Sequence, residues 1–451
     1  MATILLFMII FIALILLIIK KEYLLYYFVF LYPILPEYLA ISISSSLPLF
    51  TASRILLIIL MFATFSRGKV KIKKNIFKEK CFGKAFLFYI CCETAVVIAH
   101  ISEMASIKTY ISVILENVIF YYVLLIHINS KRKFEGCMKA LLCGAALVFT
   151  MGMLEPITKV NLAATFLDTG SRETLLMSSY VRYDSVRAVF SFGHAIALGV
   201  YCIALLPLIM YKINQTKKIQ FYLLYLLGII CLIMTMSRGV IAIFGVLFGI
   251  SLFKLNRNER MGYWKILGIG IISGFLLIVL SPEMFSVAQE TVFATLNAFG
   301  GKFTVSDSGG NDYAVLSRFS QFSMLPQVLK KYPLFGGGTG YIFNNNIFVY
   351  AGSRRFIAES IDMEYLSMLI NRGIVGFLGG TGLYITLLKL SHRMSKIYKD
   401  RLCNAFFYSF LSIILAYFTV AQLTTGRILW MLIVLFISYR RIFFNDSKRG
   451  N

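Results

Sequence analysis

The chain has 451 residues, of which 59% are hydrophobic and only 15% are charged, whereas an ordinary soluble domain carries about 25% charged residues. This composition excludes an ordinary soluble protein. The net charge of +24 does not indicate nucleic acid, because it is concentrated in the short connections between apolar runs, at residues 20–22, 67–84, 131–139, 212–218, 254–265, 389–401 and 440–449.

Apolar runs recur along the whole chain, and each has roughly the 20 residues that a helix needs to cross the hydrocarbon core of a bilayer. They predict transmembrane helices near residues 3–19, 22–38, 49–65, 84–101, 109–128, 137–155, 188–210, 219–235, 239–254, 266–282, 364–388, 403–422 and 428–440. We therefore expect an all-α polytopic integral membrane protein of about 12–14 transmembrane helices, with residues 1–451 forming a single transmembrane domain. The first run lacks a basic start and a small-residue cleavage site, so it is expected to be a span and not a removed signal peptide.

The basic connections also predict the orientation, because Lys and Arg are enriched in cytoplasmic loops. Alternating the spans with the basic connections inside places the C-terminus in the cytoplasm. Two longer connections then lie outside, near residues 156–187 and 282–362. Acidic and basic residues are nearly balanced in both, and the second is long enough to contain short helices, for example around 317–331. These two outer loops are the predicted functional surface.

The sequence carries no pattern that indicates a cofactor. It has no CxxC, no HExxH and no P-loop, and its eight cysteines lie outside both outer loops. We therefore expect no cofactor, no dedicated metal site and no exported disulfide framework.

Charged residues at membrane depth are costly, which makes them functional candidates. Arg238 lies between two apolar runs and is followed by Gly239, which we expect to let the chain turn tightly. Its guanidinium can bind a phosphate with two parallel hydrogen bonds; extending toward lipid headgroups is the alternative role. Arg54, near the start of the third predicted span, has the same two possibilities.

Three glutamates and a histidine are also placed in or near the predicted helices. Glu93 and Glu116 are expected to be paired or neutral structural carboxylates, whereas no role is favoured for Glu155. His194 opens the seventh predicted span, where it can cap or pack against the helix or bind a ligand.

The second outer loop and the span that follows it carry the strongest pattern. Arg318 is followed by a glycine cluster at 336–340, which allows close backbone approach or a sharp turn. Asp362 and Glu364 then stand two positions apart at the mouth of a span, and this spacing does not place them on one helix face. We expect only one of them to face a cavity. An ordinary helix start, where the helix dipole favours acidic residues, is the alternative.

This order of features resembles the O-antigen polymerase and ligase superfamily (Wzy and WaaL types). In that family an arginine-to-histidine segment opens a mid-chain span, an SRG turn follows, and a large outer loop leads through a glycine-containing stretch to an acidic or histidine-containing helix start. The corresponding residues here are Arg187 to His194, Ser237-Arg238-Gly239, Arg318, Pro333 to Gly338, Asp362-Met363-Glu364-Tyr365-Leu366 and Gly373 to Gly376, with Arg182 separated from Gly193 as in polymerase outer loops. The resemblance covers roughly residues 180–380. The ligases have a histidine where this chain has Asp362, and the form found here is more similar to polymerases of capsule or exopolysaccharide.

The resemblance implies a GT-C-like, metal-independent membrane glycosyltransferase in the bacterial cytoplasmic membrane, with its active cavity on the outer side. The donor would be a glycan on undecaprenyl diphosphate, and the acceptor a sugar hydroxyl on the next lipid-linked repeat unit. Arg238 and Arg318 would stabilise the leaving diphosphate, Asp362 or Glu364 would accept the hydroxyl proton, and Arg54, Arg182, Arg187, His194, Gly336, Gly338 and Tyr365 would bind substrate. A chain-length regulator, a flippase and the lipid bilayer are the implied partners.

Two other functions stay open at this stage. A ligase would transfer finished polymer to a different acceptor with the same donor and fold. A lipid-linked oligosaccharide flippase would also be polytopic and carry arginines in the membrane, but it would not need either carboxylate.

Overall fold

The computed structural model describes residues 2–41, 48–65, 82–166, 180–182, 185–254, 264, 268, 282–297, 303, 318–351, 354–358, 360–421 and 425–444. This part of the chain is mostly helical. The α-helices are α1 (Ala2–Ile19), α2 (Lys21–Leu31), α3 (Ala52–Phe65), α4 (Phe82–Ala99), α5 (Met104–Val113), α6 (Phe120–His127), α7 (Lys131–Thr158), α9 (Ala195–Thr216), α10 (Ile219–Met234), α11 (Arg238–Lys254), α13 (Pro282–Asn297), α15 (Met324–Leu329), α16 (Tyr341–Asn344), α17 (Glu364–Tyr398), α18 (Arg401–Ala416) and α19 (Gly426–Phe443).

Short irregular helices and three two-stranded antiparallel ribbons complete the described elements. The irregular helices are the π-helix η2 (Ile114–Ile119) and the 3-10 turns η3 (Ala164–Phe166) and η4 (Gln321–Ser323). The ribbons pair β1 (Ala40–Ile41) with β2 (Phe50–Thr51), β3 (Val181–Arg182) with β4 (Ser185–Val186), and β5 (Phe348–Ala351) with β6 (Arg354–Ile357).

The helices coincide with the predicted spans. Each predicted span contains a helix except 266–282, of which the structure describes only residues 268 and 282. Among the described helices, six are long and apolar enough to cross a membrane: Ala2–Ile19, Phe82–Ala99, Met104–His127, Lys131–Thr158, Ala195–Thr216 and Glu364–Tyr398. Four shorter apolar helices are Ala52–Thr64, Ile219–Met234, Arg238–Phe253 and Arg401–Ala416. The chain thus fits an all-α membrane protein, and the number of 12–14 crossings stays a prediction.

Some boundaries differ from the predicted ones. Helix α7 continues through Pro156 to Thr158, so the first outer loop begins later than expected. Helix α9 begins at Ala195 and not at 188, because Phe190 and Gly193 have positive φ angles of 46° and 70°, which no α-helix accommodates. Helix α17 extends beyond the predicted 388 to Tyr398.

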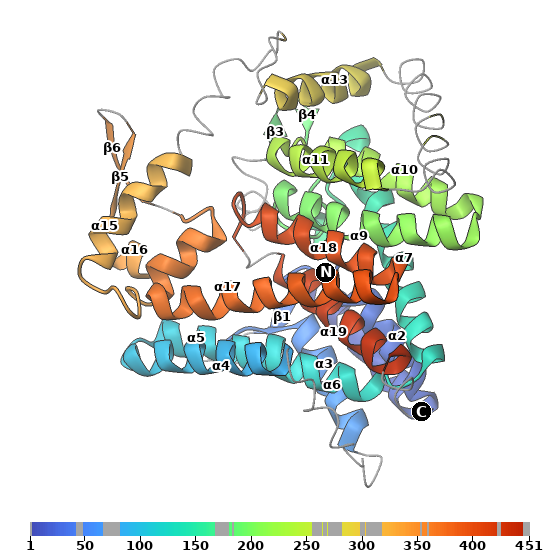
Figure 1. Cartoon of the computed structure of the whole chain (residues 1–451), viewed down its shortest axis with the longest axis horizontal. Coiled ribbons are helices and arrows are strands. Elements are labelled where there is room, and N and C mark those ends of the chain that lie inside the picture. The colour runs from blue at the N-terminus through green and yellow to red at the C-terminus, as the bar shows by residue number, and fades with distance from the viewer. Residues whose placement is uncertain are drawn as a thin grey trace.

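Helix α9 lies at the centre of the bundle. It is buried along most of its length and packs against α7, α10, α11 and α18. Helix α18 in turn packs along α17, which packs along α4, so that these helices lie side by side in Figure 1. The elements α15, α16, β5 and β6 gather at the left-hand end of α17, where that helix begins. The predicted short helix around 317–331 is confirmed by η4 and α15.

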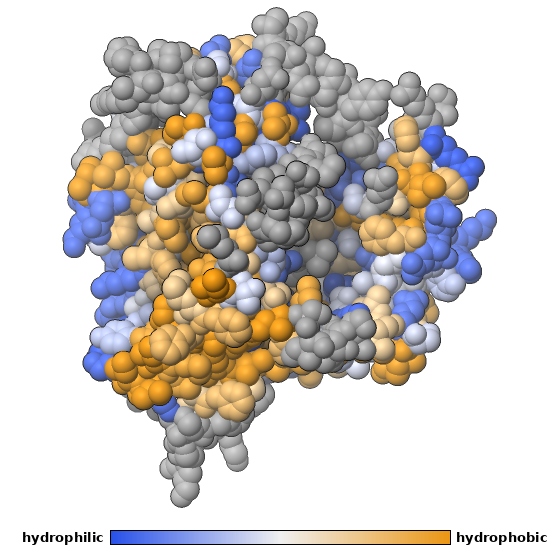
Figure 2. All heavy atoms as spheres, turned by 180° about the vertical axis from the view of Figure 1, so that it is seen from behind, coloured by the Kyte–Doolittle hydropathy of each residue, from blue (hydrophilic) through white to orange (hydrophobic). Residues whose placement is uncertain are grey.

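The outer surface of the bundle is apolar, as expected for helices that face lipid. Helix α1 is hydrophobic on all sides, and Phe11 and Ile18 are 63% and 85% exposed. Figure 2 shows hydrophobic residues over much of one face, with hydrophilic residues gathered toward its left and right edges. Because soluble monomeric proteins rarely expose such a large apolar surface, the arrangement supports insertion in a membrane.

Candidate functional site

The turn between α10 and α11 is held by an arginine from the first outer loop. Met236 in this turn has a φ of 49°, which is uncommon for a residue other than glycine. The buried guanidinium of Arg187 donates from Nε to the Thr235 carbonyl at 2.9 Å and from Nη2 to the Ser237 hydroxyl at 3.1 Å. These contacts stabilise a backbone conformation that the sequence alone would not favour.

A second arginine completes the turn, since Arg182 donates from Nη1 to the Met236 carbonyl at 2.8 Å. The expectation that Gly239 provides the turn is wrong: Gly239 lies inside α11, where a Cβ atom would approach Thr419 Cγ2 to 3.2 Å. Arg238 is therefore the first residue of α11. Its guanidinium is half-buried and forms no hydrogen bond or ion pair with another described residue.

His194 caps the N-terminus of α9, as one of its predicted roles required. Its Nδ1 accepts a hydrogen bond from the Ile196 amide at 3.0 Å. Burial lowers the pKa of His194 to about 4, and the charge of Arg187 acts in the same direction, while Asp362 opposes them and Arg318 reinforces them. The ring is therefore neutral at pH 7, and because Nδ1 is an acceptor, the proton lies on Nε2. His194 thus presents a neutral N–H donor close to three charged side chains.

The segment before α9 is fixed by a buried glutamate. Glu155 Oε2 accepts hydrogen bonds from the amides of Val189 and Phe190 at 2.8 and 2.6 Å. The side-chain Nδ2 of Asn161 donates to the other carboxylate oxygen, Glu155 Oε1, at 2.6 Å. Glu155, for which the sequence favoured no role, therefore positions the loop that leads to His194.

Arg318 and Asp362, from the second outer loop, interact with His194. We call the following residues the arginine cluster: Arg182, Arg187, His194, Arg238, Arg318 and Asp362. Burial lowers the pKa of Arg318, with a smaller effect of the like charge of Arg238, whereas Asp362 raises it. The Asp362 amide donates to Gln321 Oε1 at 3.1 Å, and the Ser360 hydroxyl donates to Asp362 Oδ1 at 3.0 Å. The Arg318 guanidinium itself forms no hydrogen bond or ion pair with another described residue.

The two carboxylates near the start of α17 face different surroundings. Asp362 lies in the extended segment before the helix and interacts with Arg318 and His194. Glu364 is buried as the first residue of α17, its amide donates to the Tyr417 carbonyl at 3.0 Å, and its carboxylate lies near Arg372 in the bundle core. Asp362 is thus the member of the pair that interacts with Arg318 and His194, and it precedes the helix. That only one of the two faces a cavity stays a prediction.

The glycine cluster packs against a kink in α17. Gly373 has a φ of 63° and a ψ of −163°, which interrupts the helix, and residues 333–338 lie along the interruption. The backbone amide of Gly337 donates to the Ile370 carbonyl at 2.8 Å, Gly338 to Asn371 at 3.1 Å, Ile374 to Pro333 at 3.1 Å and Val375 to Leu334 at 3.0 Å. A Cβ atom on Gly336 would lie 2.6 Å from backbone atoms of this kink. We call residues 333–338 and 370–375 the glycine clamp.

The glycine clamp changes the interpretation of two predicted substrate-binding residues. Gly336 and Gly338 allow the loop to approach α17, and a Cβ atom on Gly338 would collide with the carboxylate of Glu103. Their predicted contact with substrate stays a prediction; what the structure shows is that they fix the end of α17 next to Asp362.

Arg54 is engaged away from the cluster. Its Nε pairs with Glu116 at 2.8 Å, and its Nη atoms donate to the Ser112 hydroxyl at 2.8 Å and to the Leu49 carbonyl at 2.5 Å. Two of the three nitrogens thus connect α3 to α5 and η2, and the third binds the chain just before β2. The structure therefore does not bring this predicted substrate-binding residue together with Arg238, and it confirms that Glu116 is a paired carboxylate.

Tyr365 lines an apolar groove that begins beside Asp362. Its hydroxyl donates to the Ile414 carbonyl at 2.8 Å, and its ring packs on Phe418 with centroids 4.5 Å apart. The groove has a volume of about 380 Å³ and is lined by Phe322, Met363, Tyr365, Leu366, Leu369, Phe377, Thr381, Tyr384, Ile385, Leu388, Ile414 and Phe418. It follows α17 from Met363 to Leu388 and lies beside the end of α18. Sequence reasoning missed the groove, since its walls are ordinary apolar helix residues.

Comparison with known proteins identifies the part of the chain that holds this cluster. Residues 223–379 match the family model described as O-antigen ligase. The superfamily resemblance is confirmed. The O-antigen ligase-like region begins in α10, ends in α17 and includes Arg238, Arg318, Asp362 and the glycine clamp. Members of this family are membrane glycosyltransferase-like enzymes of the ligase and polymerase type. A search of curated proteins finds no match to the chain.

Arg182, Arg187 and His194 lie before the matched region, yet they contact its turn or interact with its charged residues. Gln321, which sequence analysis gave no role, connects Asp362 to η4. The only sequence signal for Gln321 is its place three residues after Arg318. No group of three described His, Cys, Asp or Glu residues is arranged to hold a metal ion.

Proposed function

We propose that the protein polymerises undecaprenyl-diphosphate-linked oligosaccharide repeat units into a surface polysaccharide at the outer face of the bacterial cytoplasmic membrane. One observation carries the proposal. Arg238 and Arg318, both half-buried, interact with each other's like charge without a hydrogen-bonded partner among the described residues, next to an apolar groove. Two guanidinium groups that feel each other's charge fit a diphosphate, and the groove fits the isoprenoid chain attached to it.

The reaction would be a direct displacement at the anomeric carbon of the donor glycan. The acceptor hydroxyl forms the new bond to that carbon, while the bond from the carbon to the diphosphate oxygen breaks. Arg238 and Arg318 stabilise the negative charge on the leaving diphosphate. Asp362, which faces them, accepts the proton of the attacking hydroxyl. The arginines supply the charge stabilisation, so the proposal includes no metal and keeps the GT-C-like assignment.

The other residues of the cluster position these groups. Arg182 and Arg187 hold the turn that ends in Arg238, and neutral His194 offers its Nε2 proton to a sugar or phosphate oxygen. Tyr365 forms a wall of the groove for the lipid chain. We no longer propose Glu364 as the base, because its surroundings are Tyr417, Tyr384 and Arg372 in the bundle core.

A ligase is the second candidate, because the matching family model is described as O-antigen ligase. Asp362 favours the polymerase, since the ligases have a histidine at the corresponding place. In either case a flippase would deliver the donor, and a chain-length regulator would accompany the polymerase.

The test is the length distribution of lipid-linked glycan in cells that carry the parent chain, no chain or the Asp362→Asn variant. A polymerase predicts that single repeat units exposed at the outer face accumulate without the chain and in the variant. Glu135→Gln, at an exposed residue of α7, is the control and should leave glycan lengths unchanged.

Two other results would point elsewhere. Long polymer that stays attached to the lipid carrier would replace the polymerase by the ligase. Single units trapped at the inner face would mean a flippase and would contradict both assignments.

A further inference from the structure

A cavity lies at the end of the bundle opposite to the arginine cluster. It has a volume of about 590 Å³, within the range typical of ligand sites. It is lined mainly by residues toward the ends of α9, α11 and α17, by Tyr225 of α10 and by α18 as far as Ser412. His194, Arg238 and Asp362 instead lie at the beginnings of α9, α11 and α17. Its lining residues are Ile203, Leu206, Pro207, Met210, Tyr211, Asn214, Tyr225, Phe244, Leu247, Phe248, Ser251, His392, Ser395, Lys396, Lys399, Asp400, Arg401, Asn404, Ala405, Phe407, Tyr408 and Ser412.

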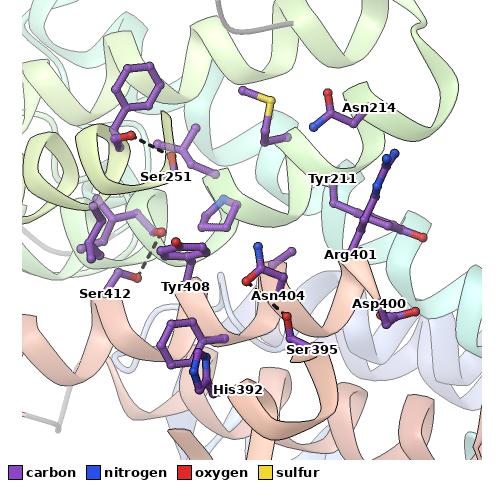
Figure 3. A pocket seen from close by; sticks show the side chains of 18 of the residues that line it. Tyr211, Asn214, Ser251, His392, Ser395, Asp400, Arg401, Asn404, Tyr408 and Ser412 are labelled. Atoms are coloured by element: carbon purple, nitrogen blue, oxygen red, sulfur yellow. Dashed lines mark hydrogen bonds between the residues drawn. The ribbon is translucent and has the colours of Figure 1, made fainter. Parts of the chain in front are cut away.

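The lining is divided between an apolar depth and a polar mouth. Leu206, Met210 and Phe248 belong to the apolar walls that α9 and α11 supply. Figure 3 shows the polar side chains Asn214, Tyr211, Arg401 and Asn404 around the opposite part of the cavity. This mouth lies where α9 and α17 end and α18 begins.

The mouth carries an excess of positive charge. Lys396 and Lys399 are exposed there and form no ion pair or hydrogen bond with another described residue. Among the described lining residues Asp400 is the one carboxylate, and it is already engaged. It caps α18 by accepting a hydrogen bond from the Cys403 amide at 2.7 Å, and it accepts another from the Tyr439 hydroxyl at 2.7 Å. Arg401 adds a third basic side chain to the rim.

The apolar and polar parts of the lining indicate what kind of molecule fits the cavity. Protein interiors are packed to the density of organic crystals, and water is retained only where several polar partners are available. The apolar depth needs an apolar group, while the mouth needs an anion. Because the helices that form the cavity are apolar enough to lie in a membrane, the surrounding bilayer can supply a molecule with both properties.

We infer that this cavity binds an anionic phospholipid, with the phosphate at Lys396 and Lys399 and an acyl chain between α9 and α11. Basic pockets between membrane helices select anionic headgroups in this way. A free phosphate would satisfy the mouth but leave the apolar depth empty, and an acidic protein segment would do the same. The site is separate from the proposed catalytic cluster and does not depend on the proposed function.

The test uses the purified full chain in nanodiscs that contain equal amounts of phosphatidylglycerol and phosphatidylcholine. Native mass spectrometry should show phosphatidylglycerol retained after release from the disc. The Lys396→Gln/Lys399→Gln variant should bind it about 30-fold more weakly, since each lysine near an anionic surface contributes roughly a fivefold factor. The control is Lys389→Gln/Arg393→Gln, which removes the same charge from the same helix at exposed residues outside the cavity; it should bind as the parent does.

Thermal melting separates a lipid from a free anion. Phosphatidylglycerol should raise the melting temperature of the parent and of the control variant, and inorganic phosphate should not. Equal retention of phosphatidylcholine, equal weakening in both variants, or stabilisation by inorganic phosphate alone would overturn the inference. Both variants change exposed side chains, so unchanged melting temperatures without lipid confirm that they fold.

Discussion

Arg372 in the bundle core and Arg238 at the start of α11 are both partly withdrawn from solvent, but their surroundings differ. Arg372, on α17, donates to Glu93 of α4 at 2.7 Å, and the two side chains are 20% and 6% exposed. Arg238 has no such partner among the described residues, and its charge acts on the like charge of Arg318. In the first region the arginine forms a hydrogen-bonded ion pair with a carboxylate. In the second region two arginines act on each other's charge, Asp362 acts on Arg318, and neither guanidinium forms a hydrogen bond or an ion pair with another described residue.

The difference teaches how the same residue type can serve packing or binding. A buried ion pair has its cost of desolvation offset only by the partner, so breaking it is expensive. An arginine without a partner is costly to the free protein, and the structure around it must hold it in place. Arg182, Arg187 and Glu155 do this through hydrogen bonds to the turn and to the segment before α9. We therefore expect variants in the two regions to fail in different ways.

Arg372→Leu should have the largest effect, and on stability. It leaves the buried carboxylate of Glu93 without a partner, which typically costs about 3–5 kcal/mol. The measurement is thermal melting of the purified chain together with its yield in the membrane. The double variant Glu93→Leu/Arg372→Leu should recover most of the loss, because no buried charge then remains unpaired.

A surface pair provides the control. Arg132 and Glu22 are 3.4 Å apart and 84% and 37% exposed, so Arg132→Leu should change the melting temperature little. If Arg372→Leu and Arg132→Leu had the same melting temperature, the ion pair between α4 and α17 would not stabilise the bundle. The structural role assigned to Arg372 would then be wrong.

Arg238→Ala should instead remove activity and leave the fold intact. Losing one donor that stabilises a developing negative charge typically lowers the rate by about 10²–10³, so lipid-linked glycan should stop at single repeat units. The melting temperature should not fall, because the guanidinium forms no hydrogen bond with another described residue.

Arg393→Ala, at an exposed arginine near the other end of α17, is the matched control and should leave elongation normal. Arg238→Lys keeps the charge but not the planar fork, so it should restore only part of the activity. Normal chain lengths in Arg238→Ala would sink the assignment of this residue to the diphosphate.

Sequence patterns located the helices well because the length of an apolar run is a local property. They also predict that Glu93 and Glu116 are neutral or paired structural carboxylates, and in the structure both are paired with an arginine. The partner of Glu93 could not be predicted, since Arg372 lies 279 residues away and only the tertiary fold brings them together. The same limit applies to the turn before Arg238. Met236 has a positive φ there, and Arg182 and Arg187, which lie far away in the sequence, donate hydrogen bonds to the carbonyls of Met236 and Thr235.

The glycine motifs show both the reach and the limit of the sequence. Residues 333–338 and the Gly373 segment were each recognised as parts of the resemblance, and close backbone approach was expected of the first. That the two motifs contact each other could not be predicted, because main-chain hydrogen bonds between them leave no trace in side-chain type. The glycine clamp connects the second outer loop to the helix that begins beside Asp362. It therefore belongs with Arg238 and Arg318, and not with the Arg372–Glu93 pair.

Gly373→Ala tests whether this clamp matters. Alanine at a positive φ costs roughly 1–2 kcal/mol, and its Cβ atom would collide with the backbone of Gly336 and Leu334. We expect a melting temperature several degrees below that of the parent and a partial loss of elongation, because the end of α17 shifts. Gly382→Ala, in the same helix with open space around its Cβ position, should be neutral or slightly stabilising, since alanine favours a helix more than glycine does. Equal effects of the two substitutions would show that the kink needs no clamp.

The smallest effect is expected from the pH dependence of His194. The pKa of His194 is about 4 in the folded chain, against an ordinary value of 6.5, because the ring is buried beside arginines. Between these two values the unfolded chain binds a proton that the folded chain does not, so stability should rise with pH from about 4 to 6.5 and stay constant above. The total should be roughly 1–2 kcal/mol, since water that reaches the half-buried ring weakens the effect. His194→Asn keeps a side chain able to cap α9 and should flatten this part of the melting profile while leaving stability at pH 7 nearly unchanged. If the variant kept the same dependence of melting temperature on pH, other groups would cause it. The low pKa of His194 beside the arginine cluster would then be contradicted.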